Sequence, residues 1–98
     1  MDNIIIDFDG TLTKNVQMWK SLIPIMQQHA HVLVVTQRTH NQENIETVEQ
    51  WLVENGFDYL VDSVIFTSAA PKFYYLEKMN IKPWILIDDD PKRAVNGF

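Results

Sequence analysis

Short, nearly continuous runs of apolar residues alternate with amphipathic segments along this chain. The apolar runs cover residues 4–6, 31–36, 63–67 and 84–87. They are too short for helices, and β-branched side chains are common in them, which favours strands. Because the runs leave almost no polar positions, they are typical of strands buried on both faces of a parallel sheet.

The segments between the apolar runs predict helices. Residues 17–28 carry apolar side chains at helical spacing. A second helix is expected to begin after Asn41, a suitable N-cap, and to end at Gly56. Pro71 is typical of the first turn of a third helix, and Pro91 of a fourth.

A strand followed by a helix, repeated four times, predicts an α/β fold. We expect a three-layer, Rossmann-like parallel sheet of about four strands with helices on both faces. No repeat, low-complexity tract or linker interrupts the pattern, so residues 1–98 are expected to form one minimal domain. In open sheets of this kind, ligands bind beyond the carboxyl ends of the strands.

Composition excludes several classes of function. Of the 98 residues, 46% are hydrophobic and 21% are charged, as in ordinary globular proteins. The chain has no cysteine, which excludes disulfides, thiolate zinc sites and thiol nucleophiles. No apolar run approaches the ~20 residues of a membrane span, so we expect a cytoplasmic protein with no membrane partner. The net charge of −5 argues against bulk attraction to nucleic acids.

Polar residues that suit one chemistry stand where the predicted strands end. In chain order they are Asp7 and Asp9, then Thr36 and Arg38, then Lys72, and finally Asp88, Asp89 and Asp90. Crowded carboxylates repel one another unless a cation lies between them, and Mg²⁺ prefers such oxygens together with phosphate and water. A hydroxyl and a lysine beside the ion would face a phosphoryl group. The set therefore predicts phosphoryl transfer with Mg²⁺ as cofactor.

Each of these residues, taken alone, has a simpler explanation. The Asp9-Gly10 step is a common turn signal, and three consecutive aspartates can form a solvated helix cap. Lys72 could be an ordinary surface lysine. Arg38 could clamp a substrate phosphate or form a surface ion pair. Their joint occurrence at four strand ends is what favours a functional site.

These segments resemble, in order, the four motifs of the haloacid dehalogenase-like phosphatases. The motifs are DFDGTLT from Asp7, Thr36 after VLVV, Lys72 before a helix, and ILIDDDP at the last strand. The TQR segment followed by TVEQWL is similar to polynucleotide kinase 3′-phosphatase domains and class B-like acid phosphatases, although Gln37 replaces their usual glycine. Residues 14–31 and 37–71 leave no room for a cap domain, so the resemblance is to capless members.

The resemblance implies a Mg²⁺-dependent phosphomonoester hydrolase. Asp7 would be the nucleophile that forms an aspartyl-phosphate, and Asp9 would serve as acid and base. Thr36 and Lys72 would complete the catalytic set. The substrate-binding residues would be Thr36, Arg38, Lys72 and Gly10. The metal ligands would be Asp7, Asp9 through its backbone carbonyl, Asp88 and Asp89, with Asp89 acting directly, through water or by orienting Lys72.

Two other functions stay open, a phospho-receiver domain and a catalytically idle binding domain. The first would need a phospho-accepting aspartate on a middle strand, where this chain has Thr36 and Thr67. The second is disfavoured by intact Asp7 and Asp9. An uncapped site suits a phosphate on a bulky substrate such as a nucleic-acid end or a protein. Together with the resemblance of the TQR segment to polynucleotide phosphatases, it favours a nucleic-acid 3′-phosphate end or a nucleotide over a sugar phosphate. The strand at 84–87 is expected near an exposed sheet edge, which favours a homodimer through that edge.

Overall fold

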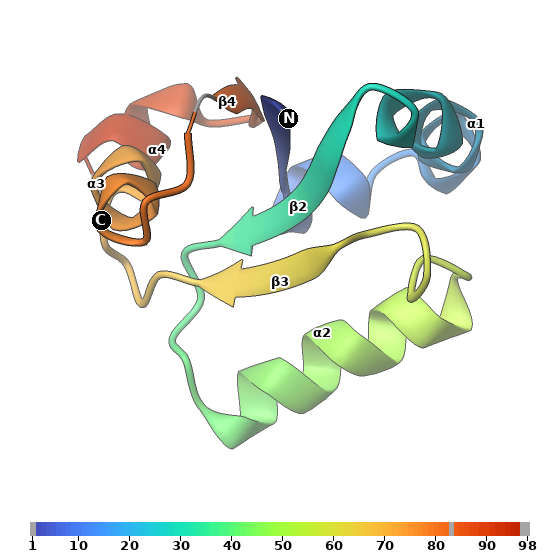
Figure 1. Cartoon of the computed structure of the whole chain (residues 1–98). Coiled ribbons are helices and arrows are strands. Elements are labelled where there is room, and N and C mark those ends of the chain that lie inside the picture. Colours follow the sequence, from blue (N-terminus) through green and yellow to red (C-terminus); the bar gives the residue numbers. More distant parts are fainter. Residues whose placement is uncertain (1, 83, 97–98) are drawn as a thin grey trace.

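Four parallel strands form one sheet in a computed structural model that describes residues 2–82 and 84–96 (Figure 1). The strands are β1 (Asp2–Asp7), β2 (Ala30–Thr36), β3 (Ser63–Phe66) and β4 (Trp84–Ile87). Their order across the sheet is β3-β2-β1-β4, and every neighbouring pair is parallel. The predicted α/β fold with a four-stranded parallel sheet is confirmed.

Helices follow the strands in the predicted order. They are α1 (Val16–Gln27), α2 (Gln42–Glu54), α3 (Lys72–Lys78) and α4 (Pro91–Asn96). The predicted N-cap of α2 is present, because the Asn41 side chain accepts a hydrogen bond of 2.9 Å from the Asn44 N–H. Gly56 ends that helix with a positive φ of 77°. In the described residues, no connection between strands holds more than one α-helix, so none contains a cap domain.

The core lies on both faces of the sheet, because successive strand residues point to opposite sides. On one face, α1 and α2 pack through Trp19, Ile23, Val48 and Leu52 against Ile6, Val32 and Val34. On the other face, Leu76 of α3 packs against Ile5, Leu33, Val35 and Ile65. The three-layer arrangement predicted from the apolar runs is therefore confirmed.

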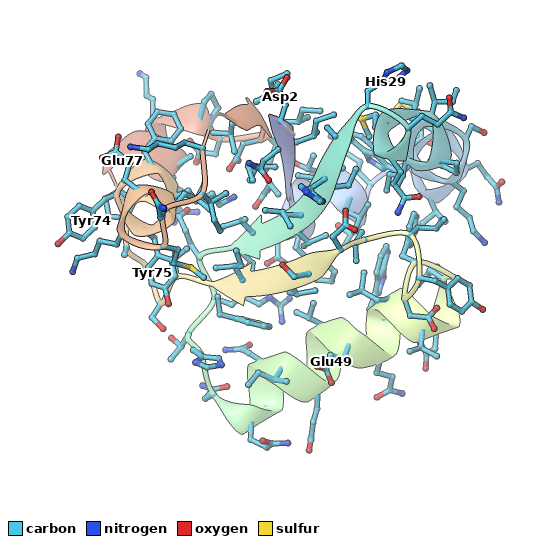
Figure 2. The ribbon with its side chains drawn as sticks, viewed as in Figure 1. Asp2, His29, Glu49, Tyr74, Tyr75 and Glu77 are labelled. Carbon is cyan, nitrogen blue, oxygen red and sulfur yellow. The ribbon has the colours of Figure 1, made fainter. Side chains whose placement is uncertain are left out.

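Because the strands are parallel, their amino-terminal ends lie together at the edge of the sheet opposite to the one formed by Asp7 and Thr36. Figure 2 labels Asp2, the first residue of β1, and His29, the residue before β2, at that end. Strand β4 lies at an edge of the sheet, and its Ile85 is 58% exposed. The predicted position of this strand is confirmed, and a homodimer through it stays a prediction. No helix within the described ranges is long and apolar enough to cross a membrane.

We expect Asn41→Ala to lower the free energy of unfolding by about 1 kcal/mol, because it removes the side-chain cap of α2. In a domain of this size, that loss corresponds to a fall of roughly 4–8 °C in Tm. Gln42→Ala is the matched control, since the neighbouring Gln42 side chain is exposed and bonds only to Glu46. Equal Tm values for the two variants would contradict the capping role.

Candidate metal centre

The register of the sheet brings three strand ends together. Asp7 is paired with Val35 of β2, and the preceding Ile6 is paired with Ile87 of β4. Thr36, Asp7 and Asp88 therefore follow one another across the carboxyl edge of β2, β1 and β4. The sequence predicted this convergence from the ends of the apolar runs, and the structure confirms it.

Lys72 is the first residue of α3, and its side chain lies underneath this edge with no exposed surface. Its Nζ donates to Asp7 Oδ1 over 2.7 Å and to Asp88 Oδ2 over 2.5 Å. A buried ammonium is costly unless it is paired, and here two carboxylates from different strands satisfy it. The explanation of Lys72 as a surface lysine is wrong.

Asp7, Asp88 and Asp89 form an acidic cluster in which one carboxylate oxygen of each lies within 4.8 Å of the others. Mg²⁺ binds oxygens at about 2.1 Å in octahedral geometry, which places ligand atoms about 3 to 4 Å from one another. The cluster therefore fits a divalent cation in ligand chemistry, and its oxygens are near enough for all three residues to reach one ion. It is a group that could hold a metal ion, at the edge where the sequence predicted one.

The surroundings of Asp7 favour the protonated form of its carboxyl. Burial and, after it, a hydrogen bond with the Asp89 carboxyl raise the pKa of Asp7 to about 7, against the lowering effect of Lys72. The same hydrogen bond from Asp7 lowers the pKa of Asp89. Opposite pKa shifts in two facing carboxyls indicate repulsion between their charges, which a bound cation would relieve.

A tight turn, η1 (Phe8–Leu12), follows Asp7 at the end of β1 and leads the chain towards α1. Gly10 has a φ of 77° in this turn, and a Cβ there would lie 2.6 Å from Asp89 Oδ2. Only glycine fits so close to the carboxylate. Position 10 therefore favours glycine for two reasons, the positive φ of the turn and the close approach of the Asp89 carboxylate.

Thr11 joins the turn to the end of β4, a role that the sequence analysis missed. Its hydroxyl lies 3.2 Å from Asp7 Oδ2 and 3.2 Å from Asp89 Oδ1, and it accepts the Asp89 N–H over 3.1 Å. The backbone carbonyl of Thr11 accepts the indole N–H of Trp19 on α1 over 2.9 Å. The threonine within DFDGT could have indicated a role at the site. Nothing in the sequence indicated that its partner would be Asp89, 78 positions away.

Asp9 points away from the three clustered carboxylates. Its two oxygens accept a bidentate pair of hydrogen bonds from Arg38, over 2.8 Å to Nε and 2.7 Å to Nη2. Arg38 was expected either to clamp a substrate phosphate or to form a surface ion pair, and the structure shows the ion pair. The Asp9 side chain is 54% exposed, so this pair contributes little to stability and can separate readily.

An open cleft of about 380 Å³ lies over these groups, lined among others by Asp7, Asp9, Thr36, Arg38, Asp88 and Asp89. Thr36 is the last residue of β2, and its hydroxyl accepts a hydrogen bond of 3.3 Å from the backbone N–H of Arg38. Gln37 connects α4 to the cleft wall, because its amide donates to the Arg93 carbonyl over 2.6 Å. The cleft thus collects every predicted site residue except Lys72, which lies buried beneath it.

Comparisons of this chain with protein-family models, curated proteins and solved structures found no match. The molecule itself shows a small parallel α/β domain with an acidic cluster at the carboxyl edge of its sheet. The three aspartates of this cluster are a group that could hold a metal ion.

We expect the metal-free protein to lose stability as the pH rises from about 4 to about 7. Folded Asp7 has a pKa of about 7, whereas its ordinary value is 3.8. Between these values the folded state binds more protons than the unfolded state, so the free energy of unfolding falls with rising pH. Thermal melts in EDTA measure this decline, which Asp7→Asn should flatten.

Millimolar Mg²⁺ should raise the Tm of the wild-type protein, and more so above pH 7 than near pH 5, because protons compete for the same oxygens. Parallel pH slopes for wild type and Asp7→Asn would contradict the raised pKa of Asp7. A Tm indifferent to Mg²⁺ would contradict binding of the ion by the cluster.

We expect Lys72→Met to destabilise the fold by several kcal/mol, on the order of 3–5, because it leaves two packed carboxylates without their cation. Lys78→Met is the matched control, since Lys78 is exposed in the last turn of the same helix. Urea titrations of both variants give the comparison. A Lys72→Met midpoint close to that of Lys78→Met would contradict the central role of the buried ammonium.

Proposed function

We propose that this protein is a Mg²⁺-dependent phosphomonoester hydrolase of the capless haloacid dehalogenase-like type. The observation that carries the proposal is the arrangement of Asp7, which contacts buried Lys72, belongs to the acidic cluster and borders an open cleft. The four motif segments of the sequence meet at this one edge. A carboxylate in that position is suited to attack a phosphoryl group bound beside a cation.

In the proposed reaction, an Asp7 oxygen attacks phosphorus and the bond to the ester oxygen breaks. Asp9 donates its proton to the departing oxygen, and the phosphoryl group stays on Asp7 as an acyl phosphate. Water then attacks phosphorus, Asp9 takes the proton from that water, and the bond to Asp7 breaks. Inorganic phosphate and the free alcohol are released, and both aspartates return to their starting states.

The acid role of Asp9 requires it to leave Arg38, and an incoming phosphate supplies the reason. A phosphoryl group offers Arg38 oxygens at the spacing that a carboxylate does, so the guanidinium can transfer from Asp9 to the substrate. Thr36, at the bottom of the same cleft, would add a hydroxyl to the phosphoryl oxygens. Asp9 is then free to take up a proton and donate it.

Asp7, Asp88 and Asp89 would hold the Mg²⁺. When bound, the ion supplies charge neutralisation that lets an anionic nucleophile approach an anionic phosphoryl group. Lys72 keeps Asp7 and Asp88 in fixed positions from below, and Asp89 reaches the cluster through Thr11 and the close approach to Gly10. The proposed substrate class is a nucleotide or a phosphorylated nucleic-acid end, which an open cleft without a cap admits.

The test is release of p-nitrophenol from p-nitrophenyl phosphate. We expect turnover with Mg²⁺, none with EDTA, and none in Asp7→Asn, because an amide is a poor nucleophile and a weak metal ligand. Asp9→Asn should lower kcat about 10²–10⁴-fold through loss of the acid and base. Asp58→Asn, an exposed aspartate outside the cleft, is the control for the substitution itself.

Turnover by Asp7→Asn at the wild-type rate would refute the covalent mechanism. Stable phosphorylation of Asp7 without release of phosphate would instead indicate a phospho-receiver domain. Mg²⁺ binding without either reaction would indicate a catalytically idle domain.

A further inference from the structure

A second hollow adjoins the cleft on the side of helix α2. This groove has a volume of about 340 Å³ and runs from turn η1 along one side of α2. Trp51, with the buried Phe8 behind it, supplies its aromatic wall. Thr47 and Gln50 form its polar rim, and Asp9 with Arg38 its inner end. The volume lies near the lower limit of ligand pockets in proteins, about 300–1,000 Å³.

Asp9 and Arg38 line both the cleft and the groove, so their ion pair is the wall between the two. In the proposed reaction the ester oxygen receives a proton from Asp9, and that oxygen carries the leaving group. The leaving group of a bound substrate must therefore begin at Asp9. The groove starts at the same residue, on the far side from the acidic cluster, and so lies where that group would extend.

The aromatic wall is rigid and suits a flat partner. The Trp51 ring meets Phe8 edge to face, with centroids 5.2 Å apart, and stacks on Phe57 at 5.6 Å. The guanidinium of Arg38 lies over the Phe8 ring, 5.5 Å from its centroid. Heterocyclic bases stack on guanidinium planes and on indoles, and one of each lines this groove.

The polar rim adds hydrogen-bonding groups beside this wall. The Gln50 amide donates to Glu54 Oε1 over 2.9 Å and retains a free carbonyl acceptor and a second N–H donor. The Thr47 hydroxyl donates to the Glu43 carbonyl over 2.8 Å, which leaves its oxygen able to accept. Such groups match the ring nitrogens and exocyclic groups of a base, whereas a plain hydrocarbon would leave them unpaired.

We propose that this groove binds the base of the leaving nucleoside, so that the preferred substrates are nucleoside phosphates and ends that present one terminal nucleoside. The inference rests on the proposed phosphatase function and specifies its substrate. It assigns Trp51 to stacking and Gln50 to hydrogen bonding with the base. Neither residue touches the phosphoryl group.

The matched substrates are adenosine 5′-monophosphate and ribose 5-phosphate, which carry the same phosphate on the same sugar and differ by the base. We expect kcat/KM at least about tenfold higher for the nucleotide, since stacking of one base contributes on this scale. Adenosine 3′-monophosphate is the third substrate. Comparison of its kcat/KM with that of the 5′ ester shows whether the site prefers a 3′ or a 5′ phosphate. Equal kcat/KM for all three esters would overturn the proposal.

Gln50→Ala should lower the ratio of nucleotide to ribose phosphate hydrolysis. Gln42→Ala is its control, because Gln42 makes the same bond to Glu46, over 2.7 Å, on the same helix but outside the groove. Trp51→Leu should lower the ratio further. A thermal melt of that variant shows whether the protein stays folded without the indole that stacks on Phe57. Equal ratios in Gln50→Ala and Gln42→Ala would contradict the assignment of Gln50.

Binding of adenosine without phosphate separates this inference from the proposed function. We expect saturable changes in the NMR signal of the Trp51 indole on addition of adenosine, and none on addition of ribose. If no phosphate ester is hydrolysed, the phosphatase proposal fails while this signal still tests the groove. If esters are hydrolysed and adenosine leaves the Trp51 signal unchanged, the groove proposal fails and the phosphatase proposal stands.

Discussion

The ammonium of Lys72, buried between Asp7 and Asp88, is the interaction on which the rest of the site depends. It joins the first residue of α3 to the ends of β1 and β4, two neighbouring strands far apart in the sequence. Without it, two carboxylates would face one another inside the protein with nothing to offset their repulsion. With it, the carboxyl edge of the sheet can be acidic and still be folded.

One ammonium does not balance the site. Asp7, Asp88 and Asp89 with Lys72 leave two negative charges when all three acids are ionised, and in the absence of metal a proton on Asp7 offsets one of them. A divalent cation would offset both. The ion pair of Asp9 with Arg38 is separate and neutral, and it lies on the surface of the cleft. The site therefore combines an acidic cluster held by a buried lysine with an exposed ion pair that can separate.

Sequence patterns predicted the fold and most of the site because both depend on local signals. Apolar runs such as 31–36 mark buried strands, and in a parallel sheet the residues that follow such runs share one edge. The burial of Lys72, the pairing of Asp9 with Arg38 and the bond from Thr11 to Asp89 could not be predicted in this way. They depend on how α3, the turn after β1 and the end of β4 pack together. The groove beside Trp51 likewise exists only once α2 is in place.

Direct detection of a phosphoryl group on Asp7 is the measurement that most closely tests this account. The protein is mixed with a phosphate ester and Mg²⁺, quenched rapidly in acid, reduced with borohydride and digested for mass spectrometry. An acyl phosphate at Asp7 would be reduced to homoserine at that position, and this conversion is the predicted result. Hydrolysis of the ester with Asp7 recovered unchanged, or with the modification on another residue, would contradict the account.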